Sequence, residues 1–258
     1  MTTDQYRVDG DVALITGASS GIGETIAERF AADGVDVVIC SREQAAVDTV
    51  ADRINESDRP GRALAVECDV TDNAAVEAMI EATLETFDGL DVLVNNAGAS
   101  FMANFDGISE NGWETIVDIN LTGTYRCTHA AAEALKDGGG IVVNLSSVAG
   151  VQGAPYMSHY AAAKSGVNAL TASLGFEWAN EGVRVNAIAP GFVATKGVEA
   201  QMGIAAEDVD RSELNRRMGT VEEIADVAQF LASPAASYIV GQTLEVAGKP
   251  AIMEDPTV

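Results

Sequence analysis

Short runs of apolar, β-branched residues alternate along the chain with longer stretches in which apolar residues recur every three or four positions. The short runs are almost continuously hydrophobic, which is typical of strands buried on both faces of a sheet. The longer stretches have the spacing of amphipathic helices. The pattern predicts strands at 11–16, 35–40, 62–67, 90–95, 140–145, 183–188 and 243–246, and helices at 22–33, 43–57, 73–87, 110–136, 158–180 and 221–232.

This alternation predicts a single α/β domain over residues 1–258, since no linker, repeat or low-complexity segment divides the sequence. Buried strands separated by helices form a parallel sheet with helices on both faces. Right-handed crossovers then give a doubly wound (Rossmann) sheet of about seven strands, whose ligand crevice lies at the carboxyl ends of the strands. We therefore expect functional residues directly after strands.

Charge changes the picture of possible partners. The chain has 15 Lys and Arg against 39 Asp and Glu, a net charge of −24, and the acidic residues are spread over its whole length. Such a surface repels nucleic acid and anionic membranes, so neither is expected as a partner. The dispersed acids also predict adaptation to molar salt, where a Debye length of about 3 Å screens self-repulsion. We expect a halophilic protein whose melting temperature rises with KCl.

Several absences predict a cytoplasmic protein. The first residues, MTTDQYRVDG, contain no apolar signal-peptide core, and no apolar run is long enough to span a bilayer. Cys40, Cys68 and Cys127 are odd in number and scattered along the sequence, which favours reduced thiols over disulfides. No spacing typical of metal ligands occurs, so no metal site is expected.

A glycine-rich turn provides the first candidate site. The first predicted strand runs directly into Thr16-Gly17-Ala18-Ser19-Ser20-Gly21-Ile22-Gly23, and a helix follows. Glycine permits a tight turn and close approach of a phosphate, and the N-terminus of the helix attracts a pyrophosphate. Three glycines alone also fit an ordinary β–α turn, but the strand–turn–helix setting favours a dinucleotide.

The end of the second predicted strand indicates which dinucleotide binds. NAD-binding sheets usually place an acid there to hold the ribose 2′-hydroxyl. Here Ser41 occupies this position and Arg42 follows it, and a guanidinium can pair with a 2′-phosphate. The sequence therefore predicts NADP(H). The alternative is that Arg42 is a solvated loop residue and the cofactor is NAD(H).

The glycine spacing G-x-x-x-G-x-G resembles that of the short-chain dehydrogenase/reductase family, and the resemblance extends over nearly the whole chain. Asp69-Val70 resembles the family's adenine-binding pair, residues 95–98 its NNAG segment, and Pro190-Gly191 its turn beside the nicotinamide. The resemblance implies a set of cofactor-binding residues. They are Gly17, Ser19, Ser20, Gly21, Ile22, Gly23, Ser41, Arg42, Asp69, Val70, Asn96, Ala97, Gly98, Tyr160, Lys164, Pro190, Gly191, Val193 and Thr195.

A tyrosine and a lysine form the candidate acid/base pair. Tyr160 and Lys164 are four residues apart in a helical segment and therefore share one face. A free phenol has a pKa of about 10. We expect the Lys164 ammonium and the positive nicotinamide to lower the pKa of Tyr160. The same pair also arises by chance, but Ser147 precedes Tyr160 by the family's spacing and Asn120 matches its fourth catalytic member.

The resemblance implies a role for each of these four residues. Tyr160 exchanges a proton with the carbonyl or alcohol oxygen, and Ser147 hydrogen-bonds the same oxygen. Lys164 binds the nicotinamide ribose, and Asn120 holds a water that connects Lys164 to solvent. His159 adjoins Tyr160 but lies about 100° around the helix, so we expect it to pack or to lie at the pocket rim.

The substrate is less well indicated. In the family, the stretch after Pro190-Gly191 closes over the substrate, which predicts a lid at about 192–217. The opposite wall, 99–104 and 148–157, is mostly small and apolar, and the resemblance to acyl-thioester reductases favours a 3-oxoacyl thioester or similar ketone. Alternatives are a sugar or polyol dehydrogenase, an enoyl-thioester reductase and a non-catalytic NADP(H) sensor. The resemblance also implies a homotetramer.

Overall fold

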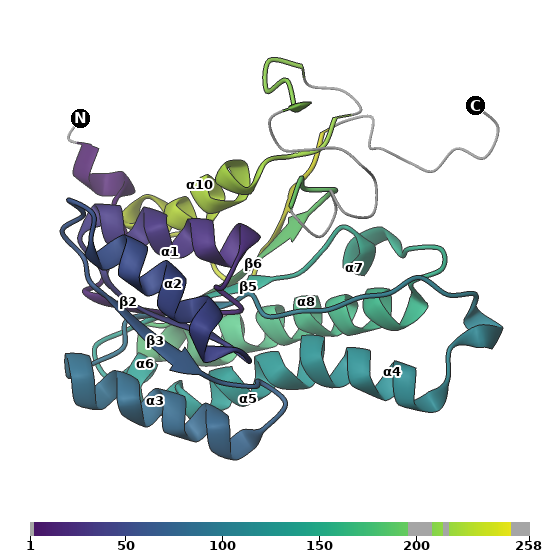
Figure 1. The fold of residues 1–258 in the computed structure, drawn as a ribbon, viewed down its shortest axis with the longest axis horizontal. Helices are drawn as coiled ribbons and strands as arrows, with labels where there is room; N and C mark the ends of the chain where they lie inside the picture. The colour runs from purple at the N-terminus through teal and green to yellow at the C-terminus, as the bar shows by residue number, and fades with distance from the viewer. Residues whose placement is uncertain (1–2, 196–207, 214–216, 249–258) are drawn as a thin grey trace.

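The computed structural model describes residues 3–195, 208–213 and 217–248 of the chain. Seven strands form one sheet in the order β3-β2-β1-β4-β5-β6-β7, and every neighbouring pair is parallel (Figure 1). This confirms the predicted doubly wound sheet. The strands are β1 (Val12–Thr16), β2 (Asp36–Ser41), β3 (Ala63–Glu67), β4 (Val92–Asn95), β5 (Ile141–Leu145), β6 (Arg184–Pro190) and β7 (Thr243–Val246).

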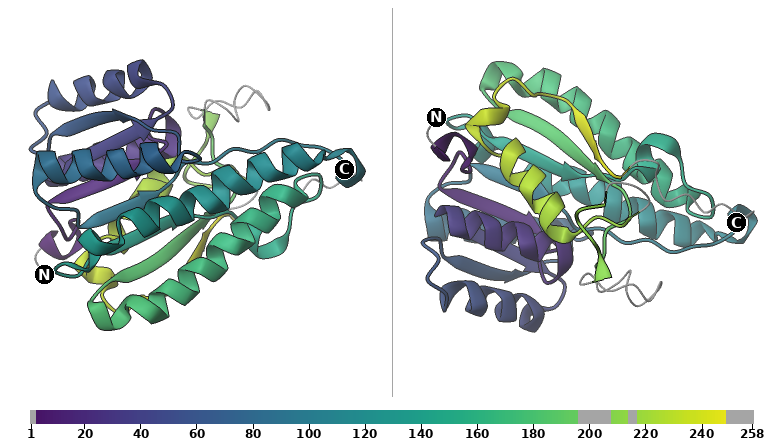
Figure 2. Two further views of the ribbon diagram at one scale, coloured as in Figure 1. Left: turned by 90° about the horizontal axis from the view of Figure 1, so that it is seen from below. Right: turned by 90° about the horizontal axis from the view of Figure 1, so that it is seen from above.

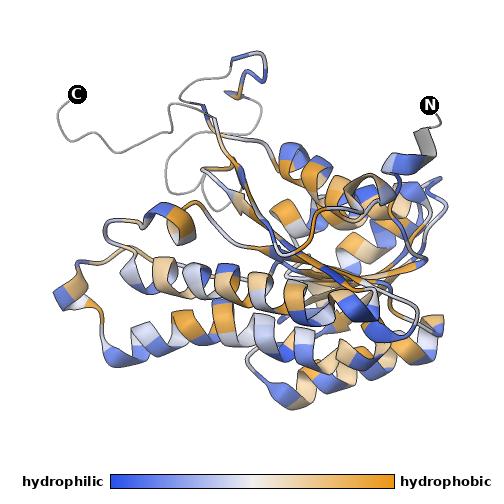
Figure 3. Ribbon diagram, turned by 180° about the vertical axis from the view of Figure 1, so that it is seen from behind, coloured by the Kyte–Doolittle hydropathy of each residue, from blue (hydrophilic) through white to orange (hydrophobic). Residues whose placement is uncertain are grey.

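Helices cover both faces of the sheet (Figure 2). One apolar cluster joins the sheet to α1, α2 and α10, and a second joins its other face to α3, α5, α6 and the end of α8. Figure 3 shows the hydrophobic residues concentrated along the strands and on the inward sides of the helices. The helices are α1 (Gly21–Asp33), α2 (Gln44–Asn55), α3 (Asn73–Phe87), α4 (Glu110–Val117), α5 (Gly123–Ala130), α6 (Ala132–Lys136), α7 (Ala149–Gln152), α8 (Ser158–Trp178) and α10 (Val221–Leu231).

The prediction of one continuous helix over 110–136 is wrong. After α4 the chain forms a π-helical turn, η3 (Asp118–Thr122), and α5 and α6 are separated at Ala131. In a π-turn the backbone hydrogen bonds reach back five residues rather than four. The side-chain amide of Asn120 instead donates to the carbonyl of Ile116, at 2.9 Å, and to that of Ala99, at 2.7 Å. The amide's competition for backbone carbonyls accounts for the irregular turn.

The cysteines lie together despite their separation in the sequence. Cys40, Cys68 and Cys127 are buried and free, and all three belong to the apolar cluster on the α3 and α5 side of the sheet. No helix in the described residues combines the length and apolar character needed to cross a bilayer.

Candidate active site

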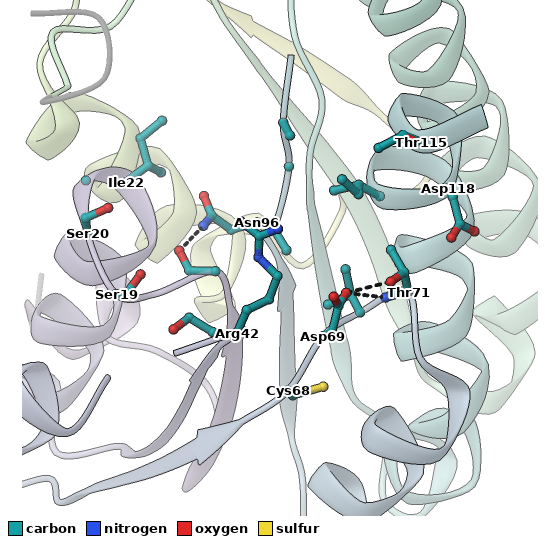
Figure 4. Close-up of a pocket in the computed structure, with 18 of the residues that line it drawn as sticks. Ser19, Ser20, Ile22, Arg42, Cys68, Asp69, Thr71, Asn96, Thr115 and Asp118 are labelled. Carbon is teal, nitrogen blue, oxygen red and sulfur yellow. Dashed lines mark hydrogen bonds between the residues drawn. The ribbon is translucent and has the colours of Figure 1, made fainter. Parts of the chain in front are cut away.

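A cavity of about 720 Å³ lies at the carboxyl ends of β1 to β4 (Figure 4). It is lined by most of the residues predicted to bind the cofactor: Gly17, Ser19, Ser20, Gly21, Ile22, Ser41, Arg42, Asp69, Val70, Asn96, Ala97, Gly98 and Thr195. Six others do not line it: Gly23, Tyr160, Lys164, Pro190, Gly191 and Val193. Ala99, which was predicted for the substrate wall, also lines it, and the sequence did not indicate five further lining residues: Cys68, Thr71, Thr115, Asp118 and Ile119. Thr115, Asp118 and Ile119 come from α4 and η3, which approach the cavity only through tertiary packing.

At two glycines of the turn between β1 and α1, there is no room for a side chain. Gly17 has a φ of +65°, and a Cβ on it would lie 2.8 Å from the Cα of Ala97. A Cβ on Gly23 would lie 2.6 Å from the carbonyl oxygen of Gly17, so Gly23 permits packing behind the turn rather than lining the cavity. The N-terminus of α1 thereby opens onto the cavity. Its unpaired N–H groups and positive dipole end suit a phosphate.

Hydrogen bonds from Asn95 and Asn96, at the end of β4, connect the elements around the cavity. Asn95 is buried and donates to Asn144 Oδ1 at 2.9 Å and to Thr128 Oγ1 at 2.8 Å, which joins β4 to β5 and α5. The Asn96 amide donates to the carbonyls of Thr16 and Gly17, at 2.9 and 2.8 Å. These bonds hold the glycine-rich turn against the end of β4, in agreement with a sheet-stabilising role for the segment.

Charged groups line the other end of the cavity. Arg42 reaches into it from the end of β2, and Asp69 lies after β3 (Figure 4). The Asp69 carboxylate accepts from Thr71 N at 2.9 Å and from Thr71 Oγ1 at 2.7 Å. Burial acts to raise the pKa of Asp69. The Thr71 hydrogen bonds and the charges of Arg42 and Arg126 outweigh it, so the pKa is lowered and the group stays ionised.

The predicted acid/base residues gather at the same edge of the sheet. Ser147 follows β5, and its hydroxyl hydrogen-bonds the phenol of Tyr160 on α8. Lys164 is one turn further along α8, with Nζ 5.6 Å from the centre of the Tyr160 ring. This ammonium is 3% exposed and donates to the carbonyl of Leu145 at 2.7 Å. The three side chains therefore lie together at this edge of the sheet.

In the protein without its cofactor, burial dominates the pKa values of Tyr160 and Lys164. Burial raises the pKa of Tyr160, and the Ser147 hydrogen bond only partly offsets this. Burial also lowers the pKa of Lys164 to about 8, because the desolvated ammonium is disfavoured. The lowering expected from Lys164 together with the positive nicotinamide stays a prediction for the cofactor-bound enzyme. The positive charge of a bound nicotinamide would add to the lowering by the Ser147 hydrogen bond.

Asn120 contributes an unpaired acceptor beside Lys164. Its side chain is fully buried, and its Oδ1 has no hydrogen-bond partner among the described residues. A Cβ placed on Gly98 would lie 2.8 Å from this oxygen and 3.6 Å from Lys164 Nζ. Both polar atoms therefore border the same small space, which glycine alone leaves open. A buried acceptor next to an ammonium provides two of the partners that a bound water needs.

The remaining predicted residues surround this centre. His159 is fully buried, its Nδ1 accepts from Tyr160 N at 2.9 Å, and its ring meets that of Phe101 edge-on at 4.2 Å. It is thus the packing residue that was expected. Pro190 ends β6, and Gly191 N donates to Val246 O at 3.0 Å. The predicted lid falls mostly outside the described residues, which include only 192–195, 208–213 and 217 of it.

Comparisons with known proteins agree with this geometry. Residues 17–248 match a family model described as "Enoyl-(Acyl carrier protein) reductase". The chain is 41% identical over 240 residues to a 3-oxoacyl-[acyl-carrier-protein] reductase of Synechocystis, covering 92% of this chain and 95% of that protein. It is 39% identical to 3beta-hydroxysteroid dehydrogenase 1 of Eggerthella lenta, covering 93% of each. A short-chain dehydrogenase/reductase structure from Mycobacterium marinum superposes with a TM-score of 0.86 at 33% identity, covering 94% of this chain and 96% of that one.

The chain therefore belongs to the short-chain dehydrogenase/reductase family. It is an oxidoreductase of the alcohol–carbonyl type and takes a nicotinamide cofactor.

Proposed function

We propose that this protein is an NADP(H)-dependent reductase that converts a ketone, of the 3-oxoacyl thioester type, to a secondary alcohol. One observation carries the proposal: Ser147, Tyr160 and Lys164 meet at the strand edge that also bears the glycine-rich cavity. The tight space around Gly17 and the open N-terminus of α1 fit a dinucleotide. When bound, the nicotinamide supplies the hydride.

The residues then divide the remaining work. The Tyr160 phenol, kept protonated by burial, donates its proton to the carbonyl oxygen of the substrate. The Ser147 hydroxyl holds that oxygen in line with the phenol. Lys164 would hold the ribose hydroxyls. Asn120 Oδ1 and Lys164 Nζ would hold a water that returns a proton toward Tyr160, in the space beside Gly98.

The substrate and the choice of cofactor are proposed on separate grounds. For the substrate, the relatives named as 3-oxoacyl-[acyl-carrier-protein] reductases favour a thioester, while those named as hydroxysteroid dehydrogenases favour a cyclic ketone. Arg42 at the end of β2 supports NADP(H). A lid at 192–217, a homotetramer, and a cytoplasm of high salt suited to the net charge of −24 complete the proposal.

A Tyr160→Phe variant tests the central step. The variant keeps the ring but loses the proton donor, so we expect cofactor binding to be unchanged and turnover to fall by about 10²- to 10⁴-fold. NADPH oxidation with acetoacetyl-CoA, a cyclic ketone and an aldose measures activity and ranks substrate classes. Tyr125→Phe is the matched control, because Tyr125 is half exposed on α5. Turnover retained by Tyr160→Phe would refute the mechanism.

A further inference from the structure

The acid that NAD-binding sheets carry at the end of the second strand has a counterpart here on the neighbouring strand. Ser41 is the last residue of β2, and its register partner on β3 is Glu67, the last residue of that strand. Partners in a parallel pair point to the same face of the sheet. Glu67 is therefore the direct strand neighbour of Ser41, a residue that lines the cavity.

The packing of the two strands identifies that face. Val37 and Ile39 of β2, with Ala63 and Ala65 of β3, belong to the cluster under α1 and α2. Because side chains alternate along a strand, Ser41 and Glu67 face the same side as these four residues. The intervening residues of both strands, such as Cys40, face the opposite cluster. Glu67 thus shares the α1 side of the sheet, where the glycine-rich turn holds the phosphate end of the cavity.

Glu67 is also available to a ligand. Its side chain is exposed, and no salt bridge to it occurs in the part of the chain that the structure describes. Ser41 Oγ is already engaged, because it donates to Glu43 O at 3.1 Å and accepts from Glu43 N at 3.3 Å. The charge of Arg42 acts on Asp69 across the cavity and contributes to the lowered pKa of that carboxylate. One exposed cation, Arg42, therefore lines the cavity, and one exposed anion, Glu67, is the register partner of its neighbour Ser41.

We propose that Glu67 favours NADH while Arg42 favours NADPH. The two opposing charges would let this reductase use both cofactors. The carboxylate would accept the ribose 2′-hydroxyl of NADH, in place of the missing acid on β2. It would repel the 2′-phosphate that Arg42 attracts. This inference rests on the proposed function, because it assumes that a nicotinamide dinucleotide occupies the cavity with its adenosine end near Arg42.

The test measures kcat/KM for NADPH and NADH in wild type, Glu67→Gln and Arg42→Ala. Glu67→Gln keeps the size and removes the charge, so the NADPH/NADH ratio should rise by about three- to tenfold. Arg42→Ala should lower the same ratio. Glu85→Gln is the control, since it removes an equal charge from an exposed residue in the last turn of α3. This turn lies at the amino ends of the strands, away from the cavity.

Salt dependence separates an electrostatic role from a structural one. The change caused by Glu67→Gln should shrink when KCl rises from about 0.1 M to above 1 M, where the Debye length is about 3 Å. An unchanged ratio in Glu67→Gln, or one equal to that of Glu85→Gln, overturns the inference while the reductase assignment stands. Failure of wild type to bind either cofactor, measured by the fluorescence of the reduced nicotinamide, would instead overturn the proposed function.

Discussion

The two halves of the crevice are built on opposite physical principles. The half near the glycine-rich turn offers backbone N–H groups and the partly exposed charges of Arg42 and Asp69. The half near Tyr160 buries its ionisable groups, and burial shifts the pKa of both Tyr160 and Lys164 toward the neutral form. Under the proposed function, cofactor binding depends on groups that water and salt can screen. The proposed proton transfer depends on groups whose desolvation costs folding free energy.

The largest effect should come from removing the buried ammonium. Lys164→Met should abolish measurable turnover, because the chain then lacks the cation beside Tyr160. The same change should stabilise the fold at pH 7 by about 1–3 kcal/mol, since a charge without a carboxylate partner leaves the interior. Activity assays and thermal unfolding check the two halves of this prediction.

Lys136→Met is the control for that experiment, because the ammonium of Lys136 is partly exposed and lies 3.0 Å from Glu181 and 4.8 Å from the centre of the Trp178 ring. It should leave both activity and stability nearly unchanged. A Lys164→Met variant that is less stable than wild type would show that the hydrogen bond to Leu145 outweighs the desolvation of the ammonium.

The pH profile sharpens the same contrast. In the folded protein the pKa of Lys164 is about 8, against 10.5 when unfolded. Between these values the unfolded chain holds the proton and the folded protein does not, so this group makes stability rise with pH from about 8 to 10.5. Activity should move the other way, and kcat/KM should fall as pH rises through about 8.

The fall of kcat/KM at high pH can be assigned to one residue, because burial keeps the pKa of Tyr160 above its ordinary value of 10. The kcat/KM profile reports the groups of the free enzyme. A limb near pH 8 belongs to Lys164, and Ser147→Ala should retain it at lower overall activity. A limb first seen above pH 10 would assign the dependence to Tyr160 and contradict the proposed role of the lysine.

The same contrast explains what the sequence could and could not predict. Strand ends, the glycine turn and the Tyr160–Lys164 spacing are local patterns, and the structure brings these residues to one edge. The pKa of Tyr160 depends on how much of the chain covers it, which no local pattern reports. The π-turn at Asn120 likewise depends on Ala99, twenty-one residues away. The pairing of Glu67 with Ser41 depends on the register of β2 against β3, which local sequence patterns do not report either.

The smallest effect should come from the binding half. Thr71→Val is nearly isosteric and removes the 2.7 Å hydrogen bond from Thr71 Oγ1 to Asp69, while the bond from Thr71 N is kept. One hydrogen bond of this kind contributes about 1 kcal/mol, so KM for the cofactor should rise by only a few-fold. The value of kcat should be unchanged, because no group near Tyr160 moves. A fall in kcat comparable to that of Tyr160→Phe would show that the two halves are coupled, and the division drawn between them would fail.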